Sequence, residues 1–262
     1  ALGIGGYRAL RALGVRPGVL HLNEGHCAFA TLEAIAQRME STGLPFRSAA
    51  EDVAESTVFT THTPVAAGHD YFDPNQVLSY LRPMQTRLGL SDHDLLGLGR
   101  VNPDNPSEEF CMTVLALKLS RRANAVSSLH GIISRRMWHS LWPERRPSEV
   151  PIGHITNGAH VDTWLGNELS QLYSDVLGSD WREHACEPRL WRRIEQLDEF
   201  QLWNIKVILK QRLIEFVLRR LAAQRARNGD TKPLPALKPE ILTIGFARRF
   251  ASYKRGTLFF QD

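Results

Sequence analysis

Two short apolar segments, separated by a helical pattern and each running into polar residues, constrain the fold of this chain more than any other feature. Residues 18–22 (GVLHL) and 57–61 (TVFTT) have the composition of strands, and the second is rich in β-branched side chains. Between them, apolar residues recur at helical spacing from Phe29 to Met39. Two apolar strands joined by a helix predict a parallel βαβ unit, and therefore an α/β fold.

Polar residues follow both predicted strands at once. The first strand runs into residues 23–26 (NEGH), and the second runs into residues 62–69, where Pro64 must end any strand ladder. Binding sites in parallel sheets lie at the carboxyl ends of the strands. We therefore expect site residues in both of these segments.

The rest of the chain alternates between helical and strand-like patterns. We expect a helix over residues 106–119 with Glu108 and Glu109 in its first turn, where the helix dipole favours carboxylates. Further expected elements are a strand at 123–126, a helix at 129–138, a strand at 152–156, a helix with an apolar stripe at 202–221 and a buried strand at 241–246. Residues 143–148 are a polar loop bounded by prolines, and we place a domain boundary near Gly153, which gives parts 1–152 and 153–262.

Charge and cysteine content exclude several classes of protein. The 32 basic residues are scattered among 28 acidic ones, and no zinc-finger spacing, aromatic RNA-binding motif or basic heptad accompanies them, so we expect no nucleic-acid partner. Three widely spaced cysteines favour reduced thiols over a disulfide framework. No apolar run has membrane-spanning length. We expect a cytoplasmic protein without a membrane partner.

Four cations crowd together near the end of the sequence, directly after the last predicted strand. Arg248, Arg249, Lys254 and Arg255 could converge on a phosphate or oxyanion, because guanidinium and ammonium groups and free helix N–H groups all bind anions. Taken without context, the same residues favour a solvated basic helix, because such clusters are common on protein surfaces.

Several single residues allow two interpretations. His21, Glu24 and His26 stand in HLNEGH, which is neither the HExxH zinc helix nor a cysteine cluster, so we predict no metal site and favour substrate contact over metal binding. His26 could also be only a residue at the start of the helix. His62, at a strand end, is either a structural histidine or a site residue. Asn157 with the following glycine could be only a turn.

Five segments taken together resemble one family. HLNEGHCAFA (21–30), TTHTPVAAGHDYF (60–72), SRRANAVSSLHGIISRRMW (120–138), GHITNGAHVDTWL (153–165) and TIGFARRFASYKR (243–255) are similar, in their order along the chain, to motifs of the α-glucan phosphorylases that act on glycogen, starch or maltodextrin. The segments THTPVAAGHD and RRFASYKR are most similar to those of the shorter, bacterial type of this family. An ordered set of five motifs is far more specific than any one of them.

The resemblance implies a fold and a reaction. The fold is of the glycosyltransferase-B type, with residues 1–152 as the latter part of the N-terminal Rossmann-like domain and residues 153–262 as the start of the C-terminal one. The reaction is phosphorolysis of non-reducing-end α-1,4-glucosyl units to α-glucose 1-phosphate, with inorganic phosphate as co-substrate and pyridoxal 5′-phosphate as cofactor. The parent enzyme would be a cytoplasmic homo-oligomer.

The resemblance also assigns roles to residues. His62 would bind the glucosyl 6-hydroxyl, with its carbonyl near the developing positive charge, Asn157 would be a second contact to that hydroxyl, and Tyr253 would reach the 2-hydroxyl. Arg249 and Lys254 would hold the substrate phosphate. Glu24, His26 and Thr63 would line the sugar pocket, and Arg248 would contact the cofactor phosphate, at a position where many family members have lysine.

The cofactor lysine and an acidic sugar-binding residue would then lie beyond Asp262. We therefore expect this chain to be an internal fragment that is inactive by itself. Two other readings remain open: a nucleotide-sugar glucosyltransferase of the same fold, and a non-catalytic carbohydrate-binding fragment.

Overall fold

The computed structural model describes residues 1–248 and 254–261, and its chain divides into two compact units. The first unit comprises Ala1–Gly158 and the second Ala159–Asp262. We describe each unit by itself.

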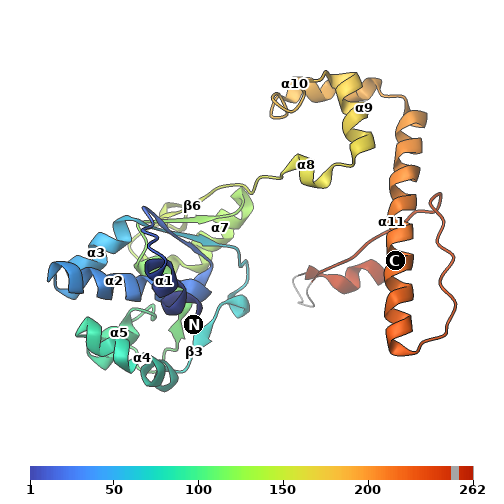
Figure 1. The fold of residues 1–262 in the computed structure, drawn as a ribbon. Coiled ribbons are helices and arrows are strands. Elements are labelled where there is room, and N and C mark those ends of the chain that lie inside the picture. Colours follow the sequence, from blue (N-terminus) through green and yellow to red (C-terminus); the bar gives the residue numbers. More distant parts are fainter. Residues whose placement is uncertain (249–253, 262) are drawn as a thin grey trace. The chain divides into compact units, whose positions relative to one another are not determined.

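A four-stranded parallel sheet forms the centre of the first unit (Figure 1). Its strands are β1 (Leu20–Asn23), β2 (Thr57–Thr61), β5 (Arg122–Ala125) and β6 (Ile152–His154), in the spatial order β1-β2-β5-β6. Leu22 lies opposite Phe59 in the register of β1 and β2, and Phe59 lies opposite Ala123 in that of β2 and β5. The predicted parallel βαβ unit, and with it the α/β class, is confirmed.

Helices cover the sheet and complete its core. The predicted helix between the first two strands is α2 (Phe29–Thr42), which ends at Gly43 in the left-handed conformation that glycine favours. It packs beside α1 (Leu2–Ala12) and α3 (Phe46–Glu55), whereas α7 (Ser128–Met137) packs on β5 and β6 (Figure 1). The fully buried side chains Leu32, Ile35, Phe59 and Leu115 show where these layers meet.

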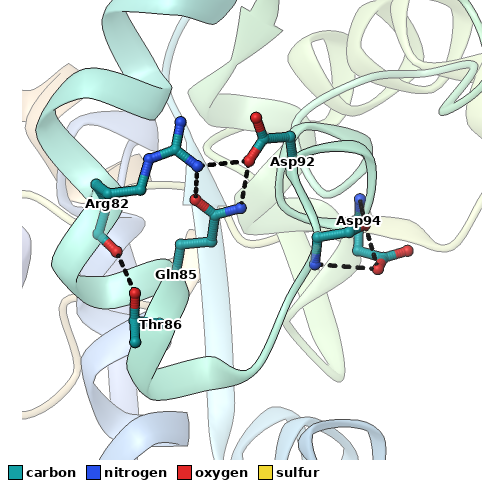
Figure 2. A network of polar contacts seen from close by, with 6 residues as sticks. Arg82, Gln85, Thr86, Asp92 and Asp94 are labelled. Atoms are coloured by element: carbon teal, nitrogen blue, oxygen red, sulfur yellow. Dashed lines mark hydrogen bonds and ion pairs between the residues drawn. The ribbon is translucent and has the colours of Figure 1, made fainter.

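The segment between β2 and β5 packs on the same hydrophobic core as the parallel sheet. It contains β3 (Tyr71–Phe72), α4 (Pro74–Leu88), α5 (Asp92–Gly97), the strand β4 (Phe110–Cys111), which is antiparallel to β3, and α6 (Met112–Lys118). Figure 2 shows how α4 is tied to α5: the buried amide of Gln85 accepts from Arg82 at 2.7 Å and donates to Asp92 at 2.6 Å. The hydrogen bond from Gln85, together with one that Arg82 donates to Asp92 at 2.6 Å, holds the pKa of the Asp92 carboxyl below its usual range.

The helix that we expected over residues 106–119 begins only at Met112, so that expectation was wrong for its first turn. The Glu108 carboxylate accepts from the N–H groups of Val101 at 2.5 Å and Asn102 at 3.0 Å. The Glu108 carboxylate therefore binds the backbone of a loop and does not interact with the N-terminus of a helix. Phe110 pairs with Phe72 in the short antiparallel sheet and is fully buried, which holds this segment extended.

The second unit is helical in its described residues. It contains α8 (Val161–Trp164), α9 (Asn167–Leu177), α10 (Pro188–Trp191) and the long α11 (Glu199–Asn228), with short 3₁₀ turns between them. Its buried side chains include Leu172, Leu177 and Trp181. Trp181 also meets Tyr173 and Trp191 edge to face, and the centroids of these three rings are 5.5 to 6.1 Å apart. Asp198 caps α11 by accepting from the Phe200 N–H at 3.1 Å.

The helix with an apolar stripe that we predicted at 202–221 is confirmed within α11, of whose residues only Ile214 is buried in the described structure. The strand that we predicted at 241–246 was wrong. Residues 241–246 form no strand, and Ile241, Leu242 and Ile244 are exposed. A strand needs a partner for its amides, and the described residues of the second unit include none.

The first unit continues past the domain boundary that we placed near Gly153. Gly153 lies in β6, opposite Asn124 of β5, and the unit ends at Gly158. The division into enzyme domains at that point stays a prediction. None of the helices in the described part of the chain is long and apolar enough to cross a membrane.

Two glycines of α1 make a matched test of how this helix packs. A Cβ on Gly5 would meet no atom within 4 Å, so Gly5→Ala is expected to raise the free energy of unfolding by about 0.5–1 kcal/mol through lower chain entropy. A Cβ on Gly3 would lie 2.8 Å from the Ala30 nitrogen, so Gly3→Ala is expected to destabilise by about 1–3 kcal/mol. Urea unfolding of both variants checks the pair, and equal effects would contradict the packing of α1 on α2.

Candidate active site

Polar residues gather where the parallel strands of the first unit end. Asn23 ends β1, and His62 follows β2 directly. The chain beyond β6 stays on the same edge, because Ile155 donates to the Ala125 carbonyl at 2.9 Å and Asn157 donates to the Val126 carbonyl at 3.1 Å. The predicted sugar-binding residues of the first unit thus belong to one edge of the sheet.

Glu24 and His62 are in direct contact at this edge. The Glu24 N–H donates to the Thr60 carbonyl at 2.9 Å, which extends the strand pairing by one residue. Its carboxylate accepts from the His62 N–H and, at 3.3 Å, from the Thr61 hydroxyl. The Glu24 carboxylate therefore fixes the backbone of His62.

Glu24 adopts an unusual backbone conformation. Its φ is +69°, a region that residues other than glycine rarely occupy and that costs about 1–3 kcal/mol. Such strain persists only where surrounding contacts enforce it, and it concentrates at functional sites. The two hydrogen bonds accepted by the Glu24 carboxylate are contacts of this kind.

The His62 ring is held by Asn23. The His62 Nε2 lies 2.8 Å from the Asn23 Oδ1, and because this oxygen only accepts, Nε2 carries the proton. Nδ1 is then an acceptor, and no residue in the described part of the chain binds it. The His62 side chain is exposed, so a hydroxyl can reach this nitrogen.

Asn23 lies in the segment 23–26 in which we expected site residues, but we assigned it no role. Its signal in the sequence is its place as the last residue of an apolar strand, directly before Glu24. What the sequence did not give is its pairing with the ring of a residue on the neighbouring strand.

The other predicted residues of the first unit lie in the segments that follow the strands, but they do not bind Glu24 or His62 in the described structure. His26 is exposed in the 3₁₀ turn Gly25–Cys27, Thr63 is half-buried and Asn157 is exposed. The Cys27 thiol donates to the Glu24 carbonyl at 3.3 Å, and burial raises its pKa, so it serves as a protonated donor. Glu24 and His62 alone among the predicted residues bind one another in the described structure.

His130 supports the loop that carries Asn157. The Val126 N–H donates to the His130 Nδ1 at 3.4 Å, and the Val126 carbonyl accepts from Asn157. His130 is buried and its Nε2 has no partner in the described residues. Only the tertiary structure brings these residues together.

Of the predicted residues in the second unit, two are described. Arg248 is exposed and Lys254 is half-buried, directly before Arg255 and the 3₁₀ turn Gly256–Phe260. Arg249 and Tyr253 lie outside the described residues. Within residues 1–248 and 254–261, no three His, Cys, Asp or Glu side chains are placed to hold a metal ion.

Comparison with known proteins gives a consistent set of relatives. The chain is 43% identical over its whole length to the maltodextrin phosphorylase of Thermococcus litoralis, 41% identical over 99% of its length to the glycogen phosphorylase of Mycobacterium tuberculosis, and 34% identical over its whole length to the glycogen phosphorylase of Aquifex aeolicus. It spans 30%, 31% and 38% of these three proteins, respectively. No protein-family model matches the chain.

Identity at this level over essentially the whole chain, to three proteins named as phosphorylases, agrees with the resemblance drawn from the five motifs. The chain is therefore homologous, along its whole length, to the glycogen and maltodextrin phosphorylases.

Proposed function

We propose that the complete protein in which this chain occurs is an α-glucan phosphorylase. It would cleave the terminal α-1,4 bond at the non-reducing end of glycogen or maltodextrin with inorganic phosphate, and release α-glucose 1-phosphate. The observation that carries this proposal is the identity of 34–43% to three phosphorylases along the whole chain.

The finer features of the family are part of the same proposal. These are a glycosyltransferase-B arrangement of two Rossmann-like domains, a cytoplasmic homo-oligomer, and pyridoxal 5′-phosphate as cofactor. The parallel sheet of the first unit is compatible with a Rossmann-like domain.

His62 would bind the 6-hydroxyl of the glucosyl unit. The free Nδ1 acceptor of its ring supports this role, because a sugar hydroxyl can donate to it while Asn23 keeps the proton on Nε2. The hydrogen bond from the His62 N–H to the Glu24 carboxylate fixes the backbone of His62, which carries this carbonyl. A carbonyl held near the anomeric carbon would stabilise positive charge in the transition state.

Asn157, Glu24, His26 and Thr63 would complete the sugar pocket. Asn157 is exposed, and its backbone N–H donates to the Val126 carbonyl. Its side-chain amide could then bind the same 6-hydroxyl. Glu24 and the other two would position the sugar and would transfer no proton. The hydrogen bonds that the Glu24 carboxylate accepts from Thr61 and from the His62 N–H support a positioning role.

Arg249 and Lys254 would hold the substrate phosphate, and Tyr253 would bind the 2-hydroxyl. A phosphate dianion that attacks near a second phosphate group is stable only where several cations offset the repulsion. Arg248, Lys254 and Arg255 are cations close in the chain, which fits a site of this charge.

The same residues fit the phosphate group of pyridoxal phosphate. Guanidinium and ammonium donors suit phosphate oxygens, and Arg248, an exposed cation, would be the residue of this chain that contacts it. When bound, the cofactor would supply a phosphate group that exchanges a proton with the substrate phosphate. Its lysine attachment would lie outside this chain.

The test is an assay of the complete protein with two donors. Maltoheptaose and inorganic phosphate are expected to give glucose 1-phosphate, and removal of the cofactor is expected to abolish that release until pyridoxal phosphate is restored. Glucosyl transfer from a nucleotide sugar is expected to be absent. Transfer from the nucleotide sugar without phosphorolysis would overturn the proposal in favour of a glucosyltransferase of the same fold.

A further inference from the structure

His69 is a buried histidine, with eight per cent of its surface exposed. It lies at the end of the loop after β2. Its Nδ1 lies 2.9 Å from the Thr113 hydroxyl in α6, and its Nε2 lies 3.2 Å from the Met137 sulfur in α7. Its ring meets Trp138 edge to face at 4.9 Å. One side chain thus ties the loop that begins at His62 to two helices.

The two contacts determine which nitrogen of His69 carries the proton. Sulfur is an acceptor only, so Nε2 donates to Met137 and Nδ1 accepts the hydroxyl proton of Thr113. Burial lowers the pKa of His69, which keeps the ring neutral and this pattern intact near pH 7.

Thr113 connects His69 to the turn that carries the sugar-pocket residues. It is buried, and both its nitrogen and its hydroxyl oxygen lie 3.0 Å from where a Cβ on Gly25 would stand. The hydroxyl that binds His69 is therefore pressed against the 3₁₀ turn Gly25–Cys27. A second tie lies alongside it, because Met112 donates to the Asp70 carbonyl at 3.1 Å.

These contacts close a ring between the two loops at the sheet edge. At one end, Glu24 binds the N–H of His62. At the other end, His69 binds Thr113, and Thr113 packs on Gly25, the residue after Glu24. The segment from His62 to His69 is thus fixed at both of its ends to the segment that carries Glu24.

We infer that His69 is a positioning residue for the sugar pocket, and that it acts through the Thr113 hydroxyl to set the separation of the Glu24 and His62 loops. Its effect on phosphorolysis rests on the proposed function. Its effect on the two loops does not.

The test removes one hydroxyl without changing the shape of the side chain. Thr113→Val is expected to speed hydrogen–deuterium exchange in residues 23–27 and 62–70 of this chain, and to lower kcat of the complete protein on the order of tenfold with a smaller change in KM. Thr113→Ser is expected to restore both. Thr31→Val is the matched control, because the buried Thr31 hydroxyl donates to the Ala28 carbonyl next to its own helix and to no other group among the described residues.

A double-mutant cycle shows whether His69 acts through Thr113. His69→Phe keeps an aromatic ring against Trp138, and is expected to match Thr113→Val in both measurements, with no further loss in the double variant. Additive losses, unchanged exchange in both loops, or equal losses in Thr31→Val would each overturn the inference. If the wild-type protein releases no glucose 1-phosphate, the proposed function fails, while the exchange measurement still decides the role of His69.

Discussion

Glu33→Gln is expected to lower the free energy of unfolding of the first unit by about 3 kcal/mol, at the lower end of the range for breaking a buried ion pair. The Glu33 side chain is two per cent exposed and accepts from Arg8 of α1 and Arg87 of α4, each at 2.8 Å. It also accepts from Gln37 at 2.9 Å. One carboxylate thus joins three helices, and Arg8 and Arg87 stay partly exposed after its loss, which limits the penalty.

Thermal unfolding measures this effect, and a shift of roughly 10 °C corresponds to it for a unit of this size. Glu51→Gln is the control, since Glu51 pairs with Arg47 on an exposed face and is expected to leave the midpoint unchanged. Equal midpoints for Glu33→Gln and wild type would show that the buried pair contributes nothing.

The Glu33 effect is also expected to depend on pH. Burial alone would raise the pKa of Glu33, but the hydrogen bonds from Arg8, Arg87 and Gln37 outweigh burial and lower it. The stabilisation is then complete above the unfolded-state pKa of about 4.3 and is lost as the pH falls through the lower folded-state pKa. The difference between wild type and Glu33→Gln is expected to shrink below about pH 4.

Gly25→Ala is expected to lower kcat/KM of the complete protein on the order of tenfold, because the turn must shift by a few tenths of an ångström within the site. The added Cβ would stand 3.0 Å from the Thr113 nitrogen and 3.2 Å from the Met112 carbonyl carbon. Both are backbone atoms of a buried helix, so the turn must move instead, and Glu24 moves with it.

Phosphorolysis kinetics with maltoheptaose check this result. Gly153→Ala is the matched control, because a Cβ there would make only an ordinary contact, 3.8 Å from the Ala123 carbonyl oxygen, and normal activity is expected. Wild-type kcat/KM in Gly25→Ala would mean that the turn tolerates movement, and that Thr113 does not fix the pocket.

The sequence predicted the part of the fold in which local pattern and burial agree. The β-branched run 57–61 and the helical spacing from Phe29 to Met39 each specify one conformation, and the polar residues after each strand marked the sheet edge correctly. The same reasoning failed at residues 241–246, because an apolar run becomes a strand only where another strand offers hydrogen bonds. It failed at Glu108 because a carboxylate early in a helical pattern can bind loop amides instead.

By itself, then, the sequence determined the α/β class, the order along the chain of the four strands of the parallel sheet, and the motifs that resemble the phosphorylases. The tertiary structure decided which residues meet: Asn23 with the ring of His62, Glu24 with its N–H, and Thr113 between His69 and Gly25. The physical reason is that periodicity depends on neighbours within a few positions. These contacts join residues far apart in the chain, and only strand register and helix packing fix which atoms approach.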